Sequence, residues 1–184
     1  MAGMSDTPFS TSAPTAAAAP RRANWAFMLR NPLHWLALGF GSGLSPVAPG
    51  TVGTLWAWVA YLVMQLWLTP AAIGWVIAGS IVIGWWACTS TARHLGVADP
   101  GAIVWDEIIA FWLILWLVMP TGFWGQLIAF VLFRFFFAVK PQPVRWADRC
   151  FKGFGWGGGW GIIWDDLVAA FCTLLVIAIG RHLL

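Results

Sequence analysis

The sequence predicts an all-α protein, a polytopic integral membrane helical bundle with about five spans, four being the alternative. Composition and the length of the apolar blocks carry this prediction. Of the 184 residues, 60% are hydrophobic and only 9% are charged, whereas about a quarter are charged in an ordinary soluble domain. So few polar side chains cannot cover a compact unit of this size in water, which excludes a conventional water-soluble enzyme.

The apolar blocks have the length that a membrane span requires. A bilayer core is crossed by about 20 helical residues, with about 17–25 as the usual range. Short breaks containing proline separate several blocks, and proline favours a turn because it lacks a backbone donor and disfavours helix in the residue before it. Spans are therefore predicted at about 53–69, 71–90, 103–119, 123–139 and 161–180.

Charges between these blocks predict how the chain is oriented. With five spans, segments 1–52, 91–102 and 140–160 lie on one side of the membrane, and an excess of basic residues marks the cytoplasmic side. That side carries Arg21, Arg22, Arg30, Arg93, Lys140, Arg145, Arg149 and Lys152, whereas the opposite side has Arg181. The first side is therefore predicted to be cytoplasmic.

Composition also predicts the domains and partners. Residues 1–23 are rich in Ala, Ser, Thr and Pro and are predicted to be a disordered tail, which leaves residues 24–184 as one membrane-embedded domain. The net charge of +3 suits anionic lipid headgroups, and there is no basic stripe of the kind that nucleic acid requires. Cys88, Cys150 and Cys172 lack the spacing of a zinc site or disulfide framework.

Two acidic pairs stand out against this apolar background. Asp106 and Glu107 follow Ile103-Val104-Trp105, and Asp165 and Asp166 follow Ile162-Ile163-Trp164 in a similar setting. Acidic side chains inside a membrane segment are functional candidates by default because their burial is costly. The similarity predicts two equivalent helix starts, where free N–H groups tolerate negative charge.

If the two pairs meet, they form a site of hard oxygen ligands. Magnesium prefers such ligands, and neither thiol nor imidazole accompanies these carboxylates in the sequence. The residues predicted as Mg²⁺ ligands or as catalytic groups are therefore Asp106, Glu107, Asp165 and Asp166. The alternative is that these acids only form ion pairs with Arg134, Lys140 or Arg93.

Two further features could hold a phosphate group. The segment 39–54 is rich in glycine, and a helix beginning near Val52 would direct backbone N–H groups of Gly50, Thr51 and Gly53 at an anion. The alternative is that this segment is a flexible loop that enters the membrane. Arg134 lies within an apolar run, and Lys140 begins a Lys140-Pro141-x-Pro143 segment that is expected to be extended. Cations beside a carboxylate-bound metal suit a phosphate ester.

In combination, three motifs resemble those of the phosphatidylglycerophosphatase A family. They are Gly41-x-Gly43-x-x-Pro46-x-Ala48-Pro49-Gly50-Thr51-x-Gly53, Ile103-Val104-Trp105-Asp106-Glu107, and Phe133-Arg134-Phe135-Phe136 with Lys140-Pro141-x-Pro143 leading to Gly161-Ile162-Ile163-Trp164-Asp165-Asp166. The resemblance implies a magnesium-dependent phosphatase of the bacterial inner membrane that converts phosphatidylglycerophosphate to phosphatidylglycerol. One departure is Phe137, which stands where the family pattern usually has an aspartate.

Two other functions remain open on the sequence. Acidic pairs at helix starts also bind coupling ions, so an ion-coupled membrane transporter is one alternative. The replacement at Phe137 keeps a second alternative open, a catalytically silent homologue that acts as a partner protein.

Overall fold

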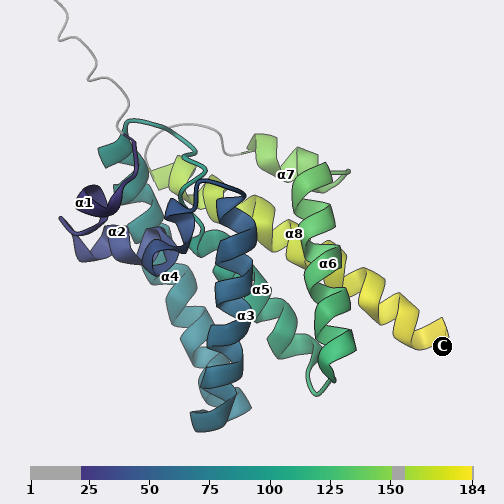
Figure 1. Cartoon of the computed structure of the whole chain (residues 1–184). Helices are drawn as coiled ribbons and strands as arrows, with labels where there is room; N and C mark the ends of the chain where they lie inside the picture. Colours follow the sequence, from purple (N-terminus) through teal and green to yellow (C-terminus); the bar gives the residue numbers. More distant parts are fainter. Residues whose placement is uncertain (1–21, 151–155, 184) are drawn as a thin grey trace, which may run out of the picture.

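The computed structural model describes residues 22–150 and 156–183, and within these ranges the chain is entirely helical, as predicted. The predicted tail, residues 1–23, lies outside the described residues except for its last two. Figure 1 shows the helices in chain order. They are α1 (Trp25–Met28), α2 (Pro32–Ala37), the 3₁₀ helix η1 (Gly39–Leu44), α3 (Pro49–Trp67), α4 (Pro70–Leu95), α5 (Trp105–Val118), α6 (Phe123–Val139), α7 (Val144–Cys150) and α8 (Trp156–Leu183).

Helix α5 forms the centre of the molecule. It packs against α3, α4, α6 and α8, and most of its side chains are buried, including Ile108, Phe111 and Leu115. Its sequence is apolar on all faces, which is the pattern of a helix enclosed by others. The first turn of α5 holds an acidic pair, so the arrangement places two carboxylates among the surrounding helices.

The helix boundaries agree with the local sequence signals. Thr69 caps α4 by accepting a hydrogen bond from the backbone N–H of Ala72, and Pro70 occupies the first turn, where its missing donor does no harm. Gly96, in the left-handed conformation, ends the same helix. The predicted turns at Pro70 and at residues 120–122 are therefore confirmed.

Fewer helices than predicted meet the criteria for a membrane span. Among the described residues, α4 and the segment Trp160–Leu183 of α8 are long and apolar enough, and α6 with α7 adds a third if this pair, bent by 57°, is one broken span. Helix α5 has 14 residues, which at about 1.5 Å per residue gives about 21 Å, short of the roughly 30 Å core of a bilayer. The five predicted blocks are helical, but they differ in length.

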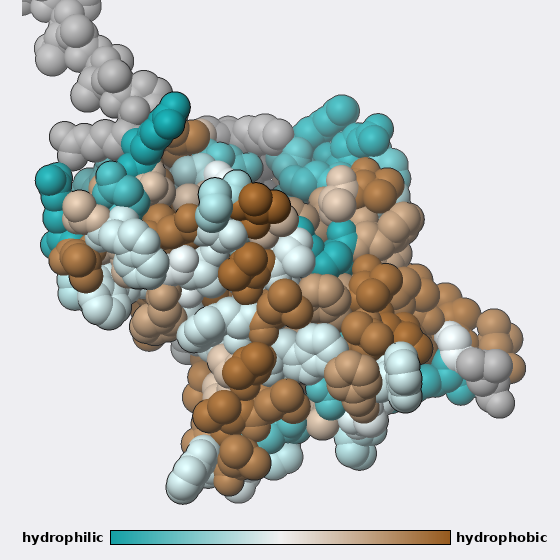
Figure 2. All heavy atoms as spheres, in the orientation of Figure 1, coloured by the Kyte–Doolittle hydropathy of each residue, from teal (hydrophilic) through white to brown (hydrophobic). Residues whose placement is uncertain are grey.

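The molecular surface has the polarity of a membrane protein. In Figure 2, strongly hydrophobic side chains are concentrated on the lower and right-hand parts of the visible face, over α3, α6 and the last turns of α8, with residues of intermediate hydropathy between them. Hydrophilic side chains gather at the opposite end, toward α1, α2 and α7. The exposed apolar residues include Val59, Leu66, Trp67, Trp75 and Val82.

Two local predictions were wrong. The second acidic pair does not begin a helix, because α8 already starts at Trp156. Helix α8 packs against α7, and the Trp160 ring contacts the Trp85 ring; these contacts outweigh the low helix propensity of the glycines. Lys140 is not extended: it ends α6 in the left-handed conformation, with φ of 43°, and α7 follows at Val144.

Candidate active site

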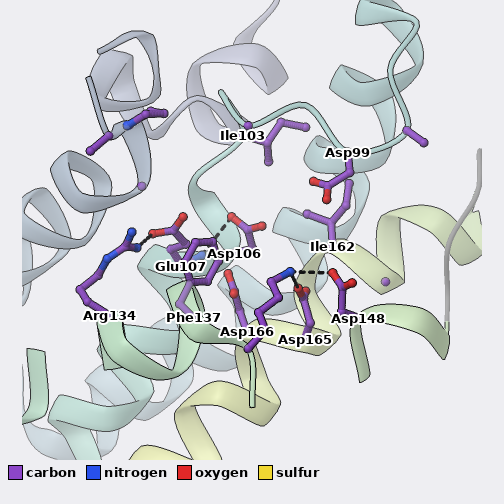
Figure 3. A pocket seen from close by; sticks show the side chains of 17 residues that line it. Asp99, Ile103, Asp106, Glu107, Arg134, Phe137, Asp148, Ile162, Asp165 and Asp166 are labelled. Atoms are coloured by element: carbon purple, nitrogen blue, oxygen red, sulfur yellow. Dashed lines mark hydrogen bonds and ion pairs between the residues drawn. The ribbon is translucent and has the colours of Figure 1, made fainter. Parts of the chain in front are cut away.

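A polar cavity of about 370 Å³ lies at the amino-terminal end of α5. Figure 3 shows it from close by, with side chains that converge from α5, α6, α7 and α8. The charged residues that line it are Asp99, Asp106, Glu107, Arg134, Lys140, Asp148, Asp165 and Asp166, and Gly50 at the start of α3 completes one wall. The structure thus brings both predicted acidic pairs into one cavity.

The first pair is positioned by the start of α5. Asp106 and Glu107 lie in the first helical turn, and a carboxylate oxygen of Asp106 accepts a hydrogen bond from the backbone N–H of Glu107 at 3.0 Å. Free N–H groups and the positive end of the helix dipole stabilise negative charge here. Both side chains are buried, so their charge also needs neighbours.

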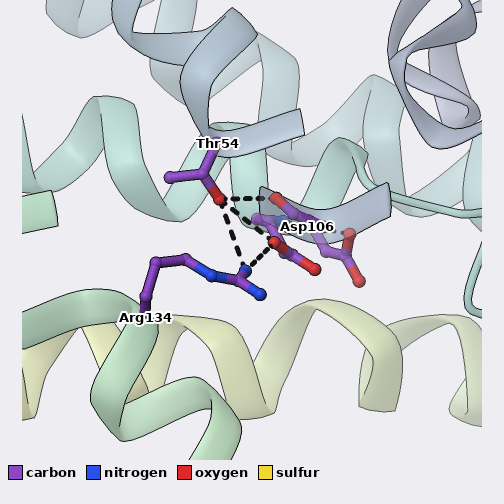
Figure 4. Close-up of polar contacts among 5 residues, drawn as sticks. Thr54, Asp106 and Arg134 are labelled. Atoms are coloured by element: carbon purple, nitrogen blue, oxygen red, sulfur yellow. Dashed lines mark hydrogen bonds and ion pairs between the residues drawn. The ribbon is translucent and has the colours of Figure 1, made fainter. Parts of the chain in front are cut away.

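The polar neighbours of Glu107 lie on α3 and α6. Arg134 of α6 forms an ion pair with its carboxylate, and the Thr54 hydroxyl of α3 lies 3.1 Å from the same oxygen. Thr54 and Arg134 approach the acidic pair from different helices in Figure 4. The glutamate also lies directly against Gly50, where a Cβ would overlap its carboxylate. Arg134, a charge within an apolar run, therefore serves this buried partner.

Lys140 connects the second pair to α7. Its ammonium lies 3.0 Å from a carboxylate oxygen of Asp165 and 2.6 Å from one of Asp148. Lys140 lies between α6 and α7, where burial alone would lower the pKa of the ammonium, but the hydrogen bonds to Asp148 and Asp165 outweigh burial and raise that pKa above its ordinary value. The cation is therefore fixed at the mouth of the cavity.

The remaining member of each pair has no cationic partner among the described residues. Asp166 is 1% exposed, and neither carboxylate oxygen has a hydrogen-bond partner within the described parts of the chain; no dashed line reaches it in Figure 3. Asp106 is held by the backbone alone. The ion pairs predicted as the alternative are thus present for Glu107 and Asp165, whereas Asp106 and Asp166 have no cationic partner within residues 22–150 and 156–183.

These donors fit a divalent cation. Within residues 22–150 and 156–183, no three acidic, histidine or cysteine side chains are already gathered in the arrangement of a metal site. The side chains of metal-ligand type that line the cavity among the described residues are all carboxylates, and magnesium prefers such oxygen ligands. A buried carboxylate without a partner is strongly unfavourable, so a cation would satisfy the oxygens of Asp166.

The glycines of the first motif allow close packing beside the cavity, and their predicted role in binding phosphate stays a prediction. Gly50 lines the cavity, whereas Thr51 and Gly53 are absent from its lining residues. A Cβ at Gly53 would crowd Val104, and one at Gly43 would overlap the carbonyl of Ala102. These glycines therefore allow the segment before α5 to pack closely against η1 and α3, and this contact places Glu107 beside Gly50.

Three polar residues at or beside the cavity were not among the predicted site residues. Thr54 and Asp148 contact predicted site residues directly, and Asp99 adds a further carboxylate to the wall. Phe137 also lines the cavity, with its ring centroid 4.7 Å from Cζ of Arg134 and 5.7 Å from Nζ of Lys140. The only signal for Asp148 was an acid within a basic segment, eight residues after Lys140.

The fold and the cavity define a helical membrane protein with a carboxylate-rich site of the kind used in metal-assisted phosphoryl chemistry. Comparison with known sequences identifies the family. Residues 35–181 match the profile of phosphatidylglycerophosphatase A, and the chain belongs to that family. The family predicted from the three motifs is therefore confirmed.

Three relatives extend over most of the chain. Phosphatidylglycerophosphatase A of Escherichia coli is 42% identical, covering 84% of this chain and 87% of its own length, and that of Haemophilus influenzae is 36% identical, covering 81% and 88%. A Bacteroides thetaiotaomicron protein, provisionally named a phosphatidylinositol-3-phosphatase, is 36% identical, covering 79% and 91%. No solved structure matches the chain significantly.

Proposed function

We propose that this protein is a phosphomonoester hydrolase that removes the terminal phosphate of phosphatidylglycerophosphate and so forms phosphatidylglycerol. Membership in the phosphatidylglycerophosphatase A family, at 42% identity to the Escherichia coli protein, supports this activity. The observation that carries it in the structure is the buried carboxylate of Asp166, which lacks a partner among the described residues and lies in the same cavity as Arg134 and Lys140.

The two cations would hold the phosphate. Arg134 uses one nitrogen for Glu107 and has further N–H donors in its planar guanidinium, which suit two oxygens of a phosphate. Lys140 is fixed by Asp148 and Asp165 and has a third N–H to donate. Their acidic partners orient these side chains and keep them charged in a buried setting.

The carboxylates would hold Mg²⁺, with Asp106 and Asp166 as its principal ligands and Glu107 and Asp165 beside them. When bound, Mg²⁺ would polarise the phosphoryl group and neutralise charge that develops on its oxygens. Carboxylates in contact with the phosphoryl group would also accept the proton of the attacking water. Ile103 and Ile162 form an apolar part of the cavity wall beside these groups.

The cavity suits a substrate that stays in the bilayer. We propose that α3 and α5 lie in the membrane with α4, α6 and α8, and that the site faces the cytoplasm of the bacterial inner membrane. Helices α3 and α6, which contribute Gly50 and Arg134 to the cavity, also carry exposed apolar side chains such as Val59 and Val131. A lipid could therefore place its headgroup among the charged residues while its chains remain in the hydrocarbon.

Phosphate release tests this function. The purified protein in detergent should liberate inorganic phosphate from phosphatidylglycerophosphate in the presence of Mg²⁺ and lose this activity in excess EDTA. Phosphatidylinositol 3-phosphate and phosphatidic acid serve as competing substrates. An absence of phosphate release under all these conditions would refute the proposal and favour an ion-coupled transporter.

The variant Phe137→Asp addresses the departure from the family pattern. An acid here would lie beside both Arg134 and Lys140, where the aromatic ring now lies. We expect the present chain to be active with phenylalanine, because its four central carboxylates are already in one cavity. A chain that releases phosphate only after this substitution would instead be the silent homologue.

A further inference from the structure

A second cavity lies on the membrane-facing surface between α3 and α6. It has a volume of about 450 Å³ and is lined by Leu55, Trp58, Val59, Leu62, Phe123 and Gln126. Its two polar side chains are already satisfied, since Nε1 of Trp58 donates to the side-chain oxygen of Gln126 and the Gln126 amide donates to the Thr121 carbonyl. The surface that remains for an occupant is therefore apolar.

The groove and the polar site lie along the same two helices, α3 and α6. Where α3 meets α6 beside the polar cavity, the contact is polar, between Thr54 and Arg134 at 3.5 Å. One turn further along, Trp58 stacks on Phe130 with ring centroids 5.7 Å apart, and beyond that it stacks on Phe123 at 5.8 Å. Figure 1 shows α3 and α6 in front with α5 between and behind them. The contacts thus change from charged to aromatic along one line.

The length of this line fits one leaflet of a bilayer. From Gly50 in the polar site to Leu62 at the far end of the groove there are 12 helical steps, about 18 Å at 1.5 Å each. From Arg134 to Phe123 on α6 there are 11 steps, about 16 Å. Half of a hydrocarbon core is about 15 Å. The far end of the groove therefore lies about one leaflet's depth from the polar site.

We propose that this groove binds an acyl chain of the lipid substrate, while the phosphate end of the same molecule occupies the cavity at Arg134 and Lys140. The inference rests on the proposed function and adds the subsite that positions the lipid. Val59 and Phe123, each 63% exposed, form the open edge through which a chain enters from the bilayer. Trp58, 9% exposed, forms the floor. Burial of the acyl chain in the groove holds the lipid headgroup at the depth of the carboxylates.

The variant Val59→Trp fills the groove and tests the proposal. The matched control is Val82→Trp on α4, because Val82 is 65% exposed but lies outside both cavities. We expect Val59→Trp to raise KM about tenfold for dipalmitoyl phosphatidylglycerophosphate, with kcat unchanged, and to leave KM unchanged for the dihexanoyl substrate, whose chains are too short to fill the groove. Val82→Trp should behave as the unmodified protein with both.

Equal KM values for Val59→Trp and Val82→Trp, or equal increases with long-chain and short-chain substrates, would overturn the proposal. A second measurement does not require turnover: a phosphatidylglycerophosphate probe carrying a diazirine at the end of one chain should label α3 and the first turns of α6 more than α4. Equal labelling of α4 would show a general lipid surface, and crosslinks between two protein copies at the groove would assign it to dimer contact. Both results would refute the acyl-chain site even if phosphate is released.

Discussion

Replacement of Asp166 by asparagine separates the stability of the site from its function. The side chain is 1% exposed and its carboxylate has no partner among the described residues. A buried charge without a partner destabilises a fold by several kcal/mol, and a neutral amide of the same size removes most of that penalty. In EDTA, we expect Asp166→Asn to unfold at the same temperature as the unmodified protein or at a higher one.

Magnesium should reverse this order. A ligand at 100 times its Kd stabilises the folded state by about 2.7 kcal/mol, and about 2–4 °C per kcal/mol is typical for a chain of this length, so the unmodified protein should gain about 5–11 °C. Asp166→Asn should gain less than about 2 °C by the same reasoning and should release no phosphate. Thermal unfolding of the detergent-solubilised protein, followed by intrinsic fluorescence with and without Mg²⁺, measures both effects.

The exposed carboxylate of Asp99 provides the control, because Asp99→Asn removes the same charge from a position that water reaches. Its unfolding temperature in EDTA should change little. The reasoning fails if Asp166→Asn is clearly less stable than the unmodified protein in EDTA, or if it keeps the full magnesium shift.

Three further predictions concern packing, the buried ion pair and pH. Gly50→Ala places a methyl group against the Glu107 carboxylate and should lower kcat/KM at least tenfold. The control Gly79→Ala places its methyl group in open space on α4 and should leave kcat/KM within twofold. Equal effects of the two substitutions would contradict the role of Gly50. Arg134→Ala leaves Glu107 without its cation and should destabilise the fold by about 2–3 kcal/mol in chemical unfolding, with partial recovery in Arg134→Lys. Burial lowers the pKa of His34, so its contribution to stability is complete above about pH 6.5 and is lost as the pH falls. The unfolding temperature should therefore decline from pH 7 to pH 5, and an equal decline in His34→Gln would exclude this histidine as the cause.

Much of the fold could be predicted from the sequence because the lipid environment permits few backbone structures. A backbone in hydrocarbon must satisfy its own hydrogen bonds, so the long apolar blocks could only be helices. Proline and glycine then set their ends, as at Pro70 and Gly96. The acidic pairs were recognisable for the same reason, since burying a charge in such segments is too costly without a use. These signals are local, so the sequence displays them directly.

The sequence by itself determined the helical class and the family, and it predicted which side chains bind a cation and a phosphate. The tertiary structure alone decided which acids are paired: Glu107 forms an ion pair with Arg134 and Asp165 with Lys140, whereas Asp106 and Asp166 have no cationic partner in the described parts of the chain. It also decided that Gly53 serves packing against Val104 and that α8 begins before its acidic pair. Ion pairing and close packing depend on distances between residues far apart in the chain, and local sequence patterns do not specify those distances.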